Sequence, residues 1–236
     1  MTVNFETDQL IILYYFGGAG GNFISSCLAL SQDANFSNAT LINRFNSTQE
    51  KFEFFKAELE KNPPAPDFNM GISQLLEIPV FNICEDTDIT ELKEYYKLSP
   101  TLAKLSTGKQ YFFLIAHYYK QLPILLKVWP NSRLLKIRNA TKWIDYRYAH
   151  KIKTHLPLEQ VSSEERAKQN FDDRYPVDPG YLDQMIEFDA NSFFKKQVFL
   201  KEMARMYQEL NLSDFDVEKI EILFDLYTTN IKKYST

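Results

Sequence analysis

The chain has 236 residues, of which 44% are hydrophobic and 15% aromatic. This apolar content supplies a packed core and excludes a natively disordered chain, and the length fits one α/β domain with an insertion. The formal net charge of -4 excludes a basic field over the whole protein, so nucleic acid is not an expected partner.

Membrane and secretory signals are missing from the sequence. No apolar run approaches the roughly 20 residues of a spanning helix, and the apolar run 10–16 lacks the basic flank of a signal peptide. The two cysteines, Cys27 and Cys84, cannot form a disulfide framework or a zinc site by themselves. We therefore expect a cytoplasmic protein with reduced thiols and no membrane span.

The first predicted elements are a strand and a helix joined by glycines. Residues 10–16 are continuously apolar, as in a strand covered on both faces, and the glycines that follow end it. From Asn22 the spacing predicts a helix that has small and apolar residues on one face. That face carries Phe23, Ser26, Cys27 and Leu30.

Residues 47–109 are expected to form a variable insert within a single domain that spans residues 1–236. A capping-box pattern begins at Ser47 and predicts a helix over 47–61, with Phe52, Phe55 and Leu59 at helical spacing. The proline-rich residues 62–66 end that helix. A strand over 78–83 and a helix over 91–104 are expected further on.

The second half begins with two more predicted strands. Residues 111–116 form a buried-strand run that ends before His117, and residues 133–137 form another that ends before Arg138. Residues 122–129 fit either a helix or a strand.

Helices predominate in the rest of the chain. Residues 141–151 have helical character, 156–180 predict a loop, and 193–234 predict two helices separated by 211–216. The first of these two helices has an apolar stripe made of Phe199, Met203, Met206, Tyr207 and Leu210.

Alternating strands and helices indicate an α/β fold with three layers, in which helices flank a mainly parallel sheet. Ligands of such sheets bind beyond the carboxyl ends of the strands. Three turns should therefore converge on one edge: residues 17–22, His117 and Arg138.

The first of these turns is rich in glycine. Four of the seven glycines of the chain fall within residues 17–21. Glycine lets backbone N–H groups approach an anion closely, and the following helix N-terminus adds unsatisfied donors and partial positive charge. A tight turn without a ligand would also use glycine, but the clustering favours an anion site.

The turn departs from the two commonest phosphate motifs. A Walker A loop needs Lys and Ser or Thr after its second glycine, whereas Gly21 and Asn22 follow Gly20 here. The dinucleotide fingerprint matches only in its first two glycines, and Phe23 stands where a third small residue is needed. Arg44 could meet a 2′-phosphate, so an NADP-dependent oxidoreductase is kept as a weaker alternative.

Three segments together resemble the sulfotransferase family that uses 3′-phosphoadenosine 5′-phosphosulfate. Residues 15–23 are similar to its phosphosulfate loop, 113–117 to the strand that ends in its histidine base, and 130–139 to its Pro-Asn-strand-Arg-Asn element. Residues 199–201 and 210–212 resemble its terminal helix. The resemblance implies a P-loop-like sulfotransferase fold, a transferase activity, the phosphosulfate nucleotide as donor and an unknown hydroxyl acceptor, which could be a glycan.

The resemblance also implies roles for individual residues. His117 would act as the base, an imidazole being suited to proton transfer near neutral pH. Arg138 would grip the 3′-phosphate. The donor would be held by Gly17, Gly18, Ala19, Gly20, Gly21, Asn22, Phe23, Ser25, Arg138 and Tyr146, with Ser26 as a further hydroxyl.

Two positions depart from the family pattern. Gly18 stands where the family has a lysine that neutralises the bridging oxygen, and Tyr146 stands where a serine shares the 3′-phosphate. Lys120 is one candidate for the replacement cation. A scaffold that has lost its chemistry and binds a nucleotide, a glycan or a protein is therefore the second hypothesis. Both His117 and Arg138 also have a plain structural interpretation, as a core or capping histidine and as one half of an ion pair.

Overall fold

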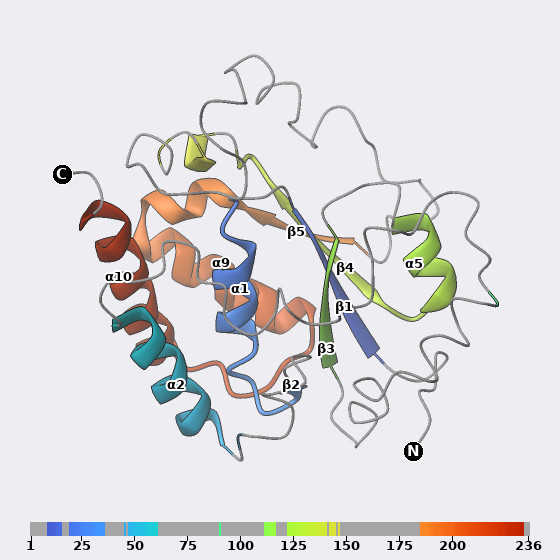
Figure 1. The fold of residues 1–236 in the computed structure, drawn as a ribbon, viewed down its shortest axis with the longest axis horizontal. Coiled ribbons are helices and arrows are strands. Elements are labelled where there is room, and N and C mark those ends of the chain that lie inside the picture. Colours follow the sequence, from blue (N-terminus) through green and yellow to red (C-terminus); the bar gives the residue numbers. More distant parts are fainter. Residues whose placement is uncertain are drawn as a thin grey trace.

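The computed structural model describes residues 9–15, 19–35, 45, 47–60, 90, 111–116, 122–140, 142–144, 146 and 185–233. In this part of the chain five strands form one sheet in the order β2-β3-β1-β4-β5, and all four neighbouring pairs are parallel (Figure 1). The strands are β1 (Gln9–Tyr14), β2 (Ala34–Asn35), β3 (Tyr111–Ala116), β4 (Arg133–Arg138) and β5 (Met185–Asp189).

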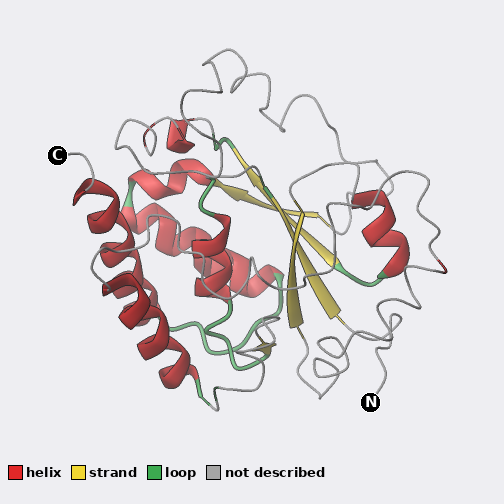
Figure 2. Cartoon of the chain, viewed as in Figure 1, coloured by secondary structure: helices red, strands yellow, loops and turns green. Residues whose placement is uncertain are grey.

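Helices pack on both faces of this sheet. α5 (Leu122–Val128) lies on one side, and α1 (Gly21–Leu28), α9 (Lys196–Glu209) and α10 (Val217–Lys233) lie on the other, with α2 (Thr48–Glu60) beside α10 (Figure 2). A short 3-10 helix, η5 (Ala190–Phe194), connects β5 to α9. The expected α/β class with a parallel sheet flanked by helices is confirmed.

The core lies between the sheet and the larger helical layer. Ile11, Ile12 and Leu13 of the central strand β1 have no exposed surface, as a strand covered on both faces requires. Phe23 of α1 stacks on Tyr227 of α10, with ring centroids 4.0 Å apart and planes 5° apart. Apolar burial at roughly 25 cal/mol per Å² is the main favourable term that holds these layers together.

The helical patterns in the sequence predict the buried faces correctly. Ser47 Oγ accepts a hydrogen bond from the backbone N–H of Glu50 at 3.2 Å, which is one half of the expected capping box. Side chains predicted on the inner faces of α2 and α9 are buried, namely Phe52, Phe55, Leu59, Phe199, Met203, Met206, Tyr207 and Leu210.

The structure settles one segment that the sequence left ambiguous and adds one strand that was not predicted. Residues 122–128, which fitted a helix or a strand, form α5. The strand β5 was not predicted; only the apolar side chains of this five-residue edge strand, Ile186 and Phe188, are buried. The expected elements at 62–66, 78–83, 91–104 and 156–180, and with them most of the insert, lie outside the described residues.

Neighbouring strands β1 and β3 send the chain to opposite faces of the sheet. β1 leads into α1 on one face, and β3 leads towards α5 on the other (Figure 1). In open α/β sheets such a point of reversal leaves a crevice beyond the carboxyl ends of the two strands. The turn after β1 and the chain after β3 are therefore where the fold predicts a ligand.

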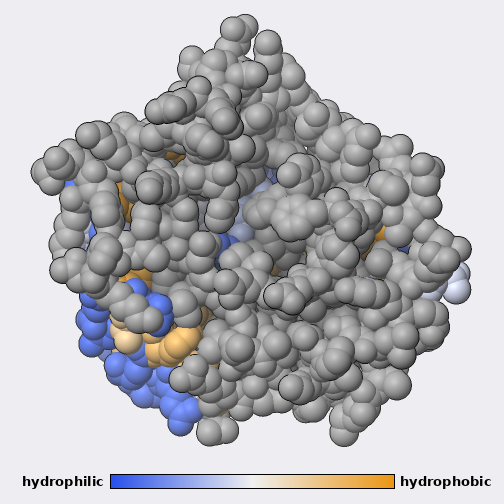
Figure 3. Space-filling model, viewed as in Figure 1, coloured by the Kyte–Doolittle hydropathy of each residue, from blue (hydrophilic) through white to orange (hydrophobic). Residues whose placement is uncertain are grey.

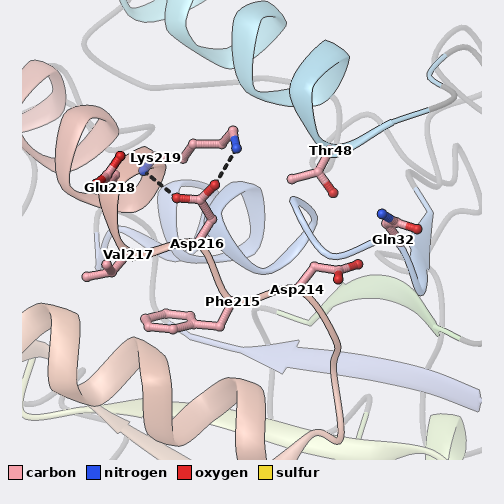
Figure 4. Close-up of a pocket in the computed structure, with 8 residues that line it drawn as sticks. All are labelled: Gln32, Thr48, Asp214, Phe215, Asp216, Val217, Glu218 and Lys219. Atoms are coloured by element: carbon pink, nitrogen blue, oxygen red, sulfur yellow. Dashed lines mark hydrogen bonds and ion pairs between the residues drawn. The ribbon is translucent and has the colours of Figure 1, made fainter.

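A separate open pocket of about 460 Å³ lies where α2 and α10 begin (Figure 4). Gln32, which follows α1, lines it together with Thr48 and residues 214–219. The glycine turn precedes α1, whose eight residues span about 12 Å, so the pocket lies at the far end of this helix. Its carboxylates include Asp216, which caps α10.

We predict that the Asp216 cap stabilises the fold in a pH-dependent way. Asp216 Oδ1 accepts from the backbone N–H of Lys219 at 3.1 Å, and its other oxygen pairs with the Lys219 ammonium. The hydrogen bond from the Lys219 side chain holds the pKa of Asp216 below its usual value of 3.8. Asp216→Ala should lower the free energy of unfolding by about 1 kcal/mol at neutral pH, measured by urea denaturation.

The comparison with Asp216→Asn isolates the charge. A carboxyl group whose pKa is depressed in the folded state stabilises the protein above its unfolded pKa, and this stability is lost as the pH falls through the folded pKa. The difference between wild type and Asp216→Asn should thus be present at pH 7 and shrink as the pH falls below about 4. A constant difference over this range would contradict the assignment.

Candidate functional site

The carboxyl ends of three neighbouring strands define the candidate site. Tyr14, at the end of β1, is in register with Ala116 of β3 on one side and with Lys136 of β4 on the other. Because the strands are parallel, the chain leaves all three at the same edge of the sheet. This edge carries the start of α1 and Arg138, together with the end of β3 at Ala116.

The start of α1 has the backbone form expected of an anion-binding turn. Gly20 occupies the N-cap position with φ of 85°, in the left-handed region that favours glycine, and α1 begins at Gly21. A glycine has no side-chain acceptor, and α1 has no side-chain cap. The partial positive charge of this helix end is therefore not offset by a capping side chain.

Aromatic rings press on both glycines of this helix start. A Cβ at Gly21 would lie 2.3 Å from the ring of Tyr15, and a Cβ at Gly20 would lie 2.8 Å from Cζ of Phe193. Tyr15 is fixed there by a hydrogen bond of 2.6 Å from its hydroxyl to Asn22 Oδ1. Packing alone thus requires glycine at these two positions, whether or not an anion binds.

The predicted hydroxyl donors are directed into the helix. The Ser25 and Ser26 hydroxyls donate to the carbonyl oxygen of Asn22 at 2.9 and 2.8 Å, and both residues have no exposed surface. Phe23 is buried among aromatic rings, including Tyr227 and Phe199. The side chain of Phe23 therefore has a packing role, and the Ser25 hydroxyl has a structural one.

A stack of rings covers the turn from the side of β4. Trp143 stacks on both Phe193 and Tyr146, with centroids 4.6 and 5.5 Å away and planes tilted by 16° and 20°. Phe194 meets Trp143 and Tyr146 edge-on and is 45% exposed. The structure thus places Tyr146, expected near a 3′-phosphate, on the outer face of this stack.

Arg138 is placed at the edge and has a carboxylate partner. Its Nη1 lies 2.7 Å from Oε2 of Glu187 on the neighbouring strand β5. Both side chains are at least one-third exposed, and an ion pair of that kind contributes at most about 1 kcal/mol. An incoming phosphate could therefore compete with Glu187 for the guanidinium at small cost.

Two residues that sequence reasoning missed lie at this edge. Lys136 is opposite Tyr14 in β4 and only 7% exposed, and its signal was a charged residue inside an aliphatic run. Trp143 lies in the segment 141–151, for which the sequence predicts only helical character. Several predicted residues lie outside the part that the structure describes, namely Gly17, Gly18, His117, Lys120, Arg44 and Cys84.

The core residues whose pKa values are shifted do not suggest a catalytic role. Burial raises the pKa of the Cys27 thiol far above its usual value, so the thiolate nucleophile does not form near neutral pH. Burial also raises the pKa of Tyr207, whose hydroxyl donates to the Cys27 carbonyl oxygen at 2.7 Å. Among the described residues, no group of three or more His, Cys, Asp or Glu side chains could hold a metal ion.

The surface offers little further guidance. Where α2 lies, the visible surface is mostly hydrophilic around a small apolar area (Figure 3). Within the described ranges no helix combines the length and the apolar character needed to cross a membrane. Comparisons with protein-family models, with curated proteins and with solved structures found no match.

We predict that Gly21→Ala destabilises the ligand-free protein by roughly 1 to 3 kcal/mol, because the new methyl overlaps the buried ring of Tyr15. This cost exceeds the helix propensity gained from alanine. The measurement is the free energy of unfolding in urea.

Two further variants separate crowding from backbone strain. Adding Tyr15→Ala should remove most of the penalty of Gly21→Ala, because the ring is gone. The same change should leave Gly20→Ala destabilised, because the positive φ of Gly20 disfavours any side chain. A Gly21→Ala protein as stable as wild type would show that Tyr15 does not pack as described.

Proposed function

We propose that this protein transfers a sulfuryl group from 3′-phosphoadenosine 5′-phosphosulfate to a hydroxyl acceptor. One observation carries the proposal: β3, β1 and β4 are adjacent parallel strands. The three segments that resemble the sulfotransferase family therefore leave the sheet at one edge. The order of these three segments in the chain does not by itself require their strands to be neighbours.

The start of α1 is the proposed position of the 5′-phosphosulfate. Gly20 and Gly21 bring backbone rather than side chain to this point, and α1 directs the positive end of its dipole there. Backbone N–H groups bind an anion without a charge of their own, so the site can hold sulfate or phosphate oxygens without the lysine that Gly18 replaces.

Arg138 is the proposed partner of the 3′-phosphate. It lies at the end of β4, next to the central strand that precedes the glycine turn. The exposed ion pair with Glu187 holds the guanidinium at the edge until the nucleotide arrives. A phosphate carries more charge than a carboxylate and accepts two parallel bonds from arginine, which favours the exchange.

Lys136 is our candidate for the cation that the loop lacks. It is buried in β4 at the level of Tyr14, whereas Lys120 lies outside the described residues. A buried ammonium near the reacting centre would stabilise the charge that develops on the leaving phosphate more strongly than an exposed one.

In the proposed reaction the acceptor oxygen attacks sulfur in line with the bond to the leaving phosphate. A new bond forms between the acceptor oxygen and sulfur, and the bond between sulfur and the bridging oxygen breaks. His117 takes the hydroxyl proton, and the bridging electron pair leaves on the nucleotide bisphosphate.

The oxidoreductase alternative loses support from the strand order. Dinucleotide-binding folds place β2 next to β1, so that a residue at the end of β2 reaches the ribose. Here β3 lies between β1 and β2. The end of β2 is thus separated from the turn after β1 by a whole strand.

We expect Arg138→Ala to weaken binding of adenosine 3′,5′-bisphosphate by about 10- to 100-fold, since charge-assisted hydrogen bonds are lost. Isothermal titration calorimetry measures this directly. Arg133→Ala is the matched control, because Arg133 starts the same strand at the opposite edge and donates to the Glu209 carbonyl. Equal weakening by both changes would contradict the site, as would no binding by the wild type at millimolar nucleotide.

Transfer of labelled sulfate to a panel of phenols and glycans tests the reaction itself. His117→Ala should slow transfer by about 10²- to 10⁴-fold with nucleotide affinity unchanged, because a base acts on the acceptor proton alone. Wild type that binds the nucleotide and transfers nothing would favour a scaffold that has lost its chemistry.

A further inference from the structure

A buried tryptophan N–H lies beside the start of α1. Trp143 is 1% exposed, and its Nε1 has no hydrogen-bond partner. Nε1 lies 3.4 Å from the position that a Cβ would take at Gly20. The donor is therefore next to the N-cap of α1, beside the Phe193 ring, whose Cζ lies 2.8 Å from the same position.

The orientation of this N–H is fixed by its neighbours. The rings of Phe193 and Tyr146 stack on the indole with planes 16° and 20° from parallel. The N–H bond lies in the plane of the indole, so this stacking restrains it from turning towards another acceptor. A buried donor without an acceptor costs about 1 to 3 kcal/mol, which few proteins accept without a reason.

Two independent features at this point thus call for an acceptor. One is the helix end with glycine at its N-cap and no side-chain cap, and the other is the indole N–H. Asn22 Oδ1, a neighbouring acceptor, already receives the Tyr15 hydroxyl. A water molecule needs acceptors as well as donors around it, whereas an oxyanion needs donors only.

We propose that Trp143 Nε1 is a hydrogen-bond donor to an oxyanion, a sulfate or phosphate group, held at the N-terminus of α1. The inference rests on the proposed function only for the position of the anion. Trp143 then acts as a binding residue supplied from beyond β4, and it joins the turn after β1 to the segment after Arg138. Because the indole is shielded from water, its bond to a charged oxygen is strong.

Nuclear magnetic resonance tests this on the wild-type protein. The chain has two tryptophans and hence two indole N–H resonances, which Trp129→Phe assigns. Titration with sodium sulfate, with pyrophosphate and with adenosine 3′,5′-bisphosphate should move the Trp143 resonance downfield. The Trp129 resonance should stay in place, because Trp129 precedes β4 at the opposite edge of the sheet. Sodium chloride at equal ionic strength should move neither.

Affinity supplies the second readout. Trp143→Phe keeps an aromatic ring and removes the donor, and it should weaken binding of these anions by about 10- to 100-fold. Trp129→Phe makes the same change elsewhere and should bind as wild type does.

The failures of the two proposals can be told apart. Nucleotide binding with an unmoved Trp143 resonance would overturn this inference and leave the proposed function standing. A Trp143 response to sulfate or pyrophosphate without nucleotide binding would do the reverse. No response and no binding with any of the three anions would overturn both.

Discussion

The steric contact between aromatic rings and the glycines at the start of α1 is the constraint on which the edge depends. A helix that begins flush against Tyr15 and Phe193 has no room for a Cβ at residues 20 and 21. Close approach in turn lets Trp143 stack on Phe193 with its Nε1 beside Gly20. The same packing that makes the glycines necessary therefore builds the site around the helix end. A glycine turn of this kind is not evidence for a ligand by itself, and the unpartnered donor beside it is the stronger sign.

The second requirement is that β5 be held in register, because β5 carries the partner of Arg138. Two residues of α9 do this through the backbone of the strand. Glu202 Oε1 accepts from the Asp189 N–H at 3.2 Å, and the Arg205 guanidinium donates to the Glu187 carbonyl. Hydrogen bonds to Glu202 raise the pKa of Arg205 further above its usual value, so its charge is permanent. The helix that closes the core thus also positions the carboxylate next to Arg138.

Hydrophobic pattern predicted much of this architecture, because the continuous apolar runs of β1, β3 and β4 and the stripe on α9 are properties of single segments. β5 was not predicted, because a short edge strand with only two buried side chains gives a weak hydrophobic pattern. The positions of Arg138 and Tyr146 could be expected, but their partners could not. Glu187 is distant in sequence from Arg138, and Trp143 lies in an aromatic-rich segment. Only the strand order pairs Glu187 with Arg138, and only ring packing pairs Trp143 with Tyr146. The burial of the Ser25 hydroxyl was likewise unpredictable, since it depends on the carbonyl of Asn22 being within reach.

Anion recognition and group transfer place different demands on this edge. Recognition needs donors fixed in space, and in the proposals above these would be a helix end, a stacked indole and an arginine on a strand. Transfer needs in addition a positive charge close to the breaking bond, which Gly18 cannot supply. Lys136 is the residue proposed for this charge, since it is basic, buried and opposite the last residue of β1. A lysine on a central strand is also held more firmly than one on a loop. A cation supplied from the sheet instead of the turn would conserve the proposed chemistry. The turn could then pack against aromatic rings.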